Sequence, residues 1–160
     1  MKSQDSITVW IVEDVVKDAL DARGAVIDAA AEANLNVNVY WDKTIQWETP
    51  LSAPPPGDYR PEFSKLSLPP TIVILDLFGP GGFLGRDFLL RLRQFEDSGH
   101  SPRSWVILWS VYTGFDEAQE LIVEEPKRDR KAVFSGGKQQ LALREKLASC
   151  LRSWKEDRFL

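Results

Sequence analysis

The segment Thr71-Ile72-Val73-Ile74-Leu75 decides the fold, because it is a short and continuous apolar run in which β-branched residues dominate. Two other segments, Ile7–Val12 and Trp105–Trp109, have the same character. Such runs are typical of strands that are buried on both faces of a sheet. Val37–Trp41 and Ala132–Phe134 are weaker strand patterns, which brings the number of expected strands to five.

Helical spacing of apolar residues appears between the strands. The first helical pattern covers residues 16–33 and includes Leu20 and Ile27 on its apolar face. The other expected helices end near Gly99, stop at Pro126, and close the chain after residue 138. Alternating strands and helices with right-handed crossovers predict an α/β fold: a doubly wound, five-stranded parallel sheet of order 2-1-3-4-5, as in flavodoxin-like proteins.

The length of 160 residues suits one domain, which we assign to residues 1–154. The remaining residues, 155–160, form a tail that is too short to be an output domain. Seven of the ten prolines fall between residues 42 and 70, which excludes a long helix or a central strand there. This segment is therefore predicted to be a proline-rich loop inserted between the second and third strands.

The charge and the rare residues exclude several classes of protein. Twenty basic and 24 acidic residues give a net charge of −4, which argues against dedicated nucleic-acid binding and against docking on an anionic membrane. A single cysteine and a single histidine exclude an internal disulfide, a cysteine-rich zinc site and multi-histidine metal sites. No apolar run is long enough for a membrane helix, so a cytoplasmic location is expected.

Polar residues follow four of the five expected strands. In parallel sheets the carboxyl ends of the strands meet at one edge, where ligands bind. Carboxylate oxygens suit Mg²⁺, and a hydroxyl and an ammonium nearby suit a phosphoryl group. An aspartate can itself be the nucleophile in such a site. The residues in question are Glu13, Asp14, Asp76, Ser110 and Lys138.

In this arrangement the chain resembles the receiver domain of two-component response regulators, over essentially its whole length. The family's acidic pair is matched by Glu13 and Asp14, and its phosphoacceptor aspartate, followed four residues later by proline, is matched by Asp76 and Pro80. Gly85 matches the glycine that precedes the following helix. Ser110 and Lys138 match the switch hydroxyl and the lysine of the family.

The resemblance implies a role for each of these positions. Asp76 would accept a phosphoryl group, and Mg²⁺ would be held by Glu13, Asp14, Asp76 and the backbone carbonyl of Phe78. Lys138 would pair with a phosphoryl oxygen. Ser110 would rotate toward the phosphoryl group, and Phe134 would be the aromatic residue that reports this switch.

The implied protein is a stand-alone phosphoacceptor switch whose only chemistry is phosphotransfer to itself. Its partners would be a histidine kinase or a histidine phosphotransferase, and a downstream protein bound to the face of the fourth helix, fifth strand and fifth helix. A homodimer remains open. One alternative is a degenerate receiver fold that is an interaction module and is never phosphorylated. Another is a small flavodoxin-like enzyme or FMN binder, which the absence of a glycine- and hydroxyl-rich loop after the first strand disfavours.

Two other features stand outside this constellation. The basic run at residues 127–131 is interpreted as a solvated connection, with partner binding as the minority interpretation. Cys150 is expected to be a half-buried packing residue.

Overall fold

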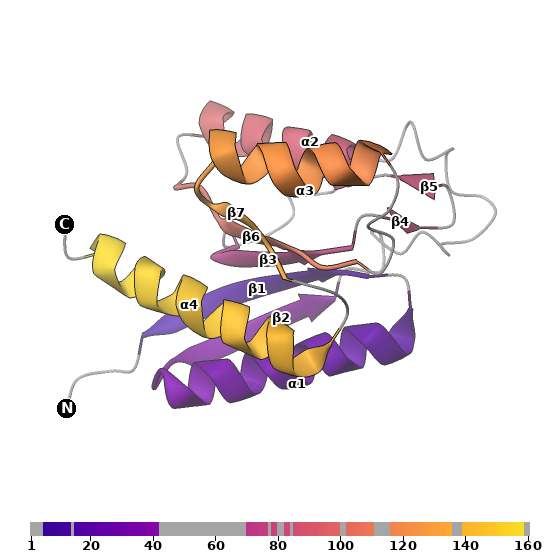
Figure 1. Cartoon of the computed structure of the whole chain (residues 1–160). Helices are drawn as coiled ribbons and strands as arrows, with labels where there is room; N and C mark the ends of the chain where they lie inside the picture. Colours follow the sequence, from indigo (N-terminus) through magenta and orange to yellow (C-terminus); the bar gives the residue numbers. More distant parts are fainter. Residues whose placement is uncertain are drawn as a thin grey trace.

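The computed structural model describes residues 5–13, 15–41, 70–76, 78–79, 82–83, 85–99, 102–110, 116–135 and 139–158. Within this part of the chain, five parallel strands form a sheet of order β2-β1-β3-β6-β7, which confirms the predicted order 2-1-3-4-5 (Figure 1). The strands of this sheet are β1 (Ser6–Val12), β2 (Asn36–Trp41), β3 (Ile72–Leu75), β6 (Trp105–Leu108) and β7 (Ala132–Phe134). The helices are α1 (Val16–Glu32), α2 (Gly85–Ser98), α3 (Asp116–Arg128) and α4 (Gln140–Arg158).

Two very short strands, β4 (Phe78–Gly79) and β5 (Gly82–Phe83), pair in antiparallel fashion immediately after β3. They include Gly79 and Gly82, and the two residues between them, 80 and 81, lie outside the described residues. The predicted proline-rich insertion, residues 42–70, lies outside the described residues except for Pro70, which is buried.

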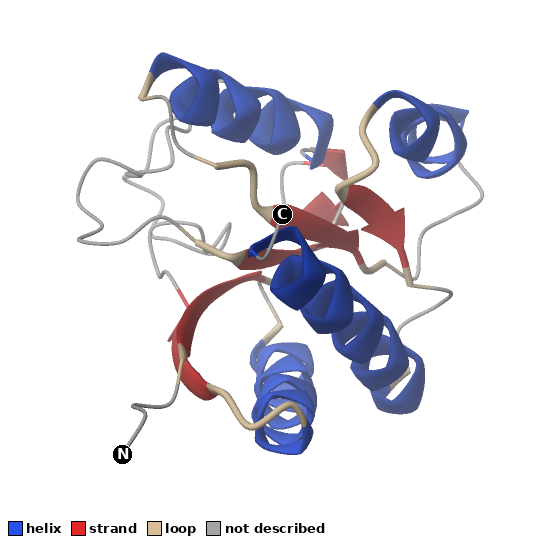
Figure 2. Cartoon of the chain, turned by 90° about the vertical axis from the view of Figure 1, so that its left-hand side faces the viewer, coloured by secondary structure: helices blue, strands red, loops and turns tan. Residues whose placement is uncertain are grey.

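Apolar side chains cover both faces of the sheet. Alternate residues of β3 point to opposite sides, so Ile72 and Ile74 join one core cluster while Val73 and Leu75 join the other. The first cluster is completed by α1 and α4, and the second by α2 and α3. Figures 1 and 2 show these two helix pairs on opposite sides of the sheet.

Small residues bring α1 close to the sheet. The face of α1 that enters the core consists mainly of alanines, together with Val26. Leu20 and Ile27, which the sequence pattern placed on the apolar face, are instead exposed. The same sequence pattern included Ala19, Val26 and Ala30, which are buried, so it located the core-facing side of the helix but made it too wide. Alanine contributes little to hydrophobicity but permits close packing of a helix on a sheet. Leu141 of α4 is also exposed, and the core takes Leu143 and Leu147 from this helix.

Two helix ends have features of their own: α3 ends later than the sequence predicts, and α1 is followed by a residue in the left-handed conformation. The prediction that the third helix stops at Pro126 was wrong, because α3 continues to Arg128. Pro126 lies in the last turn, where its missing N–H removes only a hydrogen bond near the helix end. After α1, Asn34 adopts a φ of 57°, the left-handed conformation that asparagine tolerates at a helix end.

Helix α1 is also joined to α4 by polar contacts. Arg144 of α4 forms ion pairs with Asp28 and Glu32 of α1. The Lys155 Nζ donates a hydrogen bond of 2.5 Å to the carbonyl of Ala33, at the C-terminal end of α1. These contacts fix the two helices relative to each other on the same side of the sheet.

A buried ion cluster joins α2 to the chain before β6 and to the loop after α3. The Arg93 Nη1 donates to Glu96 at 2.7 Å, and the Arg93 Nε donates to Asp129 at 2.8 Å. Glu96 in turn accepts a hydrogen bond of 2.6 Å from the backbone N–H of Ser104. The Arg93 and Glu96 side chains are only 10% and 1% exposed, so the cluster pairs charges inside the protein, while the Arg93 Nη2 has no hydrogen-bond partner among the described residues.

We predict that Arg93→Ala lowers the free energy of unfolding by about 3–5 kcal/mol, because it leaves two carboxylates buried without their cation. Urea unfolding followed by circular dichroism measures the change. The matched control is Arg86→Ala, which breaks an ion pair of 2.7 Å with Glu120 that is about half exposed and should cost less than about 1 kcal/mol. Equal losses in the two variants would contradict the prediction.

Gly24 provides a test of the contact between α1 and α4. A Cβ atom at this position would lie 2.9 Å from the Gln140 Nε2, the flexible end of an exposed side chain. Because the amide of Gln140 can move, we predict that Gly24→Ala stabilises the protein by about 0.5–1 kcal/mol through helix propensity. Chemical unfolding of Gly24→Ala beside Gly24→Ala/Gln140→Ala measures this gain. If Gly24→Ala lowers the stability and the added Gln140→Ala reverses that loss, the prediction is wrong, because the Gln140 side chain then does not move away from the new Cβ atom.

Candidate functional site

The backbone aligns the residues that follow the central strands. Leu75 of β3 pairs with Val12 of β1 and with Leu108 of β6. The ladder continues one residue further: the Asp76 N–H donates to the carbonyl of Val12 at 3.0 Å, and the Trp109 N–H donates to the carbonyl of Leu75 at 2.9 Å. Asp76 is therefore held between the residues that follow β1 and β6.

One row of residues crosses this edge of the sheet. Counting one position past the paired residues places Glu13, Asp76, Trp109 and Ser135 side by side on β1, β3, β6 and β7. The Ser135 N–H donates to the carbonyl of Leu108 at 3.0 Å, which extends the row to the last strand. Two of the expected carboxylates thus occupy adjacent strands at equal height.

Both carboxylates are buried. Glu13 is 1% exposed and Asp76 is 5% exposed. The Glu13 Oε1 accepts a hydrogen bond of 3.1 Å from the backbone N–H of Val15, the residue before α1. This bond ties the Glu13 side chain to the start of α1, while its position in the row keeps Glu13 next to Asp76.

The other expected site residues are described only in part. Ser110 is fully buried after β6, next in sequence to Trp109. Phe134 is half-buried and packs against the core cluster on the α2 and α3 side of the sheet. The backbone of Phe78 belongs to β4, two residues beyond Asp76. Asp14 and Lys138 lie outside the described residues.

Two buried residues of the row were not among the sequence candidates. The Ser135 hydroxyl is buried and has no hydrogen-bond partner among the described residues. Trp109 is 1% exposed and packs in the core cluster formed with α1 and α4. Their positions follow from the register of β6 and β7, which the sequence pattern leaves undefined by one or two residues.

The donor set at this edge suits a hard divalent cation. Oxygen ligands from carboxylates and carbonyls are what Mg²⁺ prefers. Glu13 and Asp76 supply two carboxylates on neighbouring strands, and charge repulsion between such a pair is relieved by a cation. Among the described residues no group of three acidic, histidine or cysteine side chains could hold a metal ion, and Asp14, the third carboxylate that the sequence analysis names, lies outside them.

The thiol of Cys150 lies in surroundings that disfavour a role as a nucleophile. Cys150 is 2% exposed, rather than half-buried as predicted, and burial raises the pKa of its thiol to about 12. The reactive thiolate is therefore scarce at neutral pH.

Among the helices that are described, none has the length and apolar character needed to span a bilayer.

Comparison of the sequence with models of known protein families gives no match, and comparison with curated proteins gives none either. The functional assignment therefore rests on the residues at the carboxyl edge of the sheet.

We predict that millimolar Mg²⁺ stabilises the protein through Asp76. Binding to the folded state alone should add about 1 kcal/mol at roughly four times the dissociation constant. Thermal unfolding with and without Mg²⁺ measures this gain. Asp76→Asn should abolish it, whereas Asp28→Asn, which removes an exposed aspartate on α1, should preserve it. If Mg²⁺ stabilises the unsubstituted protein, Asp76→Asn and Asp28→Asn equally, the cation binds at a site that does not involve Asp76.

Proposed function

We propose that the protein is a phosphoacceptor switch of the receiver type, built on a doubly wound sheet with a proline-rich insertion at residues 42–70. A phosphohistidine on a partner kinase or phosphotransferase would be the phosphoryl donor, and Asp76 the acceptor. The observation that carries this proposal is the alignment of buried Glu13 and Asp76 on adjacent strands, with Ser110 at the end of the next strand.

The chemistry assigned to Asp76 is nucleophilic attack. A carboxylate oxygen forms the new bond to phosphorus, the phosphorus–nitrogen bond of the phosphohistidine breaks, and the histidine nitrogen leaves with the electron pair. The position of Asp76 supports this role because its own N–H bonds to β1, and the carbonyl of the preceding residue, Leu75, accepts a hydrogen bond from the Trp109 N–H. A fixed nucleophile needs little reorganisation before it reacts.

Glu13, Asp14, Asp76 and the carbonyl of Phe78 are the groups assigned to hold Mg²⁺. When bound, the cation neutralises the charge that the carboxylates and the phosphoryl group share. Glu13 keeps its hydrogen bond to Val15 in this role, since a carboxylate has lone pairs for both contacts.

Signalling is assigned to residues after β6 and β7. The Ser110 hydroxyl would donate to a phosphoryl oxygen, and the Lys138 ammonium would pair with another. Phe134 would respond to the movement of Ser110 by a change of rotamer. The downstream partner would then bind the face formed by α3, β7 and α4, which corresponds to the fourth helix, fifth strand and fifth helix of the family.

A second candidate function is an interaction module with the same fold that is never phosphorylated. The hydrogen bond from Val15 to Glu13 favours it, because that bond gives the acidic residue a structural role without any cation. The two candidates differ in one observable, a covalent phosphoryl group on Asp76.

We predict that incubation with acetyl phosphate and Mg²⁺ adds one phosphoryl group to the protein. Intact-mass spectrometry measures the adduct. Asp76→Asn should abolish it, since the amide is a poor nucleophile. Ser110→Ala should still be modified, because Ser110 is assigned to signalling and not to attack.

Two controls sharpen this experiment. Asp28→Asn should be modified like the natural protein, and omission of Mg²⁺ should reduce the adduct strongly. An adduct that persists in Asp76→Asn would contradict the assignment of the acceptor. Absence of any adduct from folded protein would favour the interaction module.

A further inference from the structure

The opposite edge of the sheet carries a second concentration of polar groups. A hollow of about 350 Å³ lies where the chain enters β6 and β7. Of the described residues, four cations and one carboxylate line it: Arg103, Arg128, Arg130, Lys131 and Asp129. This hollow is unrelated to Asp76, which lies at the carboxyl ends of the strands.

The carboxylate in this hollow is already engaged. Asp129 accepts a hydrogen bond of 2.8 Å from Arg93, and its other oxygen accepts one of 3.0 Å from the backbone N–H of Lys131. Its side chain is only 10% exposed. The negative charge inside the hollow is therefore engaged by Arg93, and Asp129 is the one carboxylate among the described residues that line the hollow.

Three of the four cations form ion pairs with carboxylates outside the lining of the hollow. The Arg103–Asp97 and Arg128–Glu125 ion pairs measure 3.3 and 3.9 Å and involve arginine side chains that are 44% and 63% exposed, so they contribute little. The Lys131 Nζ donates to the backbone carbonyl of Arg103 at 3.0 Å. An ammonium group has two further N–H donors, which can bind a ligand.

Arg130 is the best-fixed of the four. It pairs with Asp157 at 2.9 Å, and its guanidinium lies 5.8 Å from the ring centre of Trp105. Burial lowers the pKa of the Lys131 ammonium group, and the neighbouring Asp157 opposes that shift. An anion brought next to Lys131 would favour its charged form further.

The interpretation of residues 127–131 as a solvated connection explains only part of this arrangement. Lys127 and Arg128 lie in the last turn of α3, where cations interact favourably with the helix dipole. That effect does not account for Arg103, which comes from the segment before β6, or for Arg130 and Lys131, which follow the helix. Separate segments thus bring four cationic side chains around one hollow of a protein with a net charge of −4, and such a concentration of positive charge attracts an anionic ligand.

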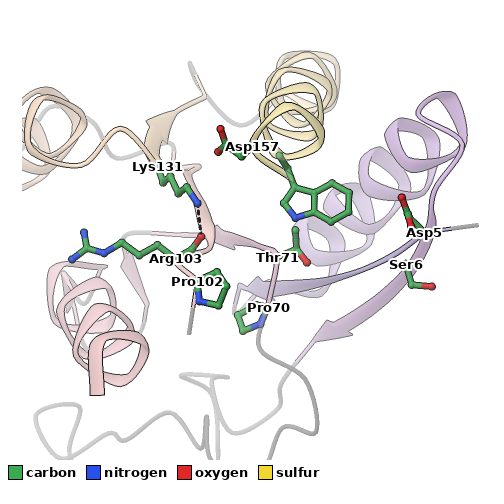
Figure 3. A pocket seen from close by; sticks show the side chains of 9 residues that line it. Asp5, Ser6, Pro70, Thr71, Pro102, Arg103, Lys131 and Asp157 are labelled. Atoms are coloured by element: carbon green, nitrogen blue, oxygen red, sulfur yellow. Dashed lines mark hydrogen bonds between the residues drawn. The ribbon is translucent and has the colours of Figure 1, made fainter. Parts of the chain in front are cut away.

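A larger cavity of about 670 Å³ adjoins the hollow and shares Arg103 and Lys131 with it. Its other walls include Trp154, the Asp157 side chain that pairs with Arg130, and the two prolines that precede β3 and β6, Pro70 and Pro102. Figure 3 shows Lys131 and Arg103 together on one side of this cavity, with Asp5 and Ser6 on the far side. An indole and proline rings form flat apolar surfaces of the kind on which a planar ring stacks.

We propose that these adjoining spaces bind a small phosphorylated ligand that carries a flat ring, of which a nucleoside phosphate is the simplest example. The phosphoryl group occupies the basic hollow, where arginine forks match its oxygens. The ring occupies the larger cavity against Trp154. Binding at this edge is independent of phosphorylation at Asp76.

The test is calorimetric titration of the full chain with adenosine diphosphate, adenosine and inorganic phosphate. Adenosine diphosphate should bind at least about tenfold more tightly than either fragment, because it uses both spaces. Arg103→Gln and Arg128→Gln should each weaken it about tenfold, the loss typical of one charged hydrogen bond. Both side chains are substantially exposed, so neither variant should impair folding.

Lys127→Gln is the matched control, since it removes the same charge from the same basic run but lies outside the lining of both spaces. It should change the affinity less than about twofold. Trp154→Phe should reduce the ligand-induced quenching of tryptophan fluorescence. Asp76→Asn should bind adenosine diphosphate normally, which separates this proposal from the proposed function.

Three results would overturn the proposal. Equal affinity for phosphate and adenosine diphosphate would indicate an adventitious ion only. Equal weakening by Lys127→Gln and Arg103→Gln would indicate unspecific attraction of anions. Preference for an RNA or a phosphopeptide over every small ligand would make this edge a macromolecular interface instead.

Discussion

The hydrogen bond from the Asp76 N–H to the carbonyl of Val12 is the contact on which the candidate site depends. It carries the parallel ladder one residue past β3 and sets Asp76 level with Glu13. A slip of one residue would turn the Asp76 side chain to the other face of the sheet. The register is secured by the core, because β1, β3 and β6 each place alternate buried residues in two separate clusters.

The two helix layers that cover the sheet are held in place by different interactions. On one side, the alanines of α1 allow close approach to the sheet, and α4 is tied to α1 by Arg144 and Lys155. On the other side, α2 is anchored through the buried Arg93 cluster to the chain before β6 and to the loop after α3. Buried charges of this kind specify position more than they add stability.

The two edges of the sheet have opposite electrostatic character. Buried carboxylates mark the carboxyl edge, where a cation and a phosphoryl group are proposed to act together. Arginines and a lysine line the amino edge, where the carboxylate of Asp129 is engaged by Arg93. The sheet keeps these groups apart, so that events at one edge reach the other only through the strands and helices between them.

The sequence by itself determined the strand order and the residues at the strand ends. Continuous apolar runs such as Ile72–Leu75, alternating with helical patterns, favour a parallel sheet covered on both faces, and the residue that follows each run then lies at the edge of the sheet. The sequence determined the buried face of α1 only in part, because the spacing that correctly includes Ala19, Val26 and Ala30 also admits Leu20 and Ile27, which are exposed. Nor did it show Ser135 in the row with Asp76, since that depends on register. Only the tertiary structure gathered Arg103 with Arg130 and Lys131, because residues distant in the chain meet through the order of the strands.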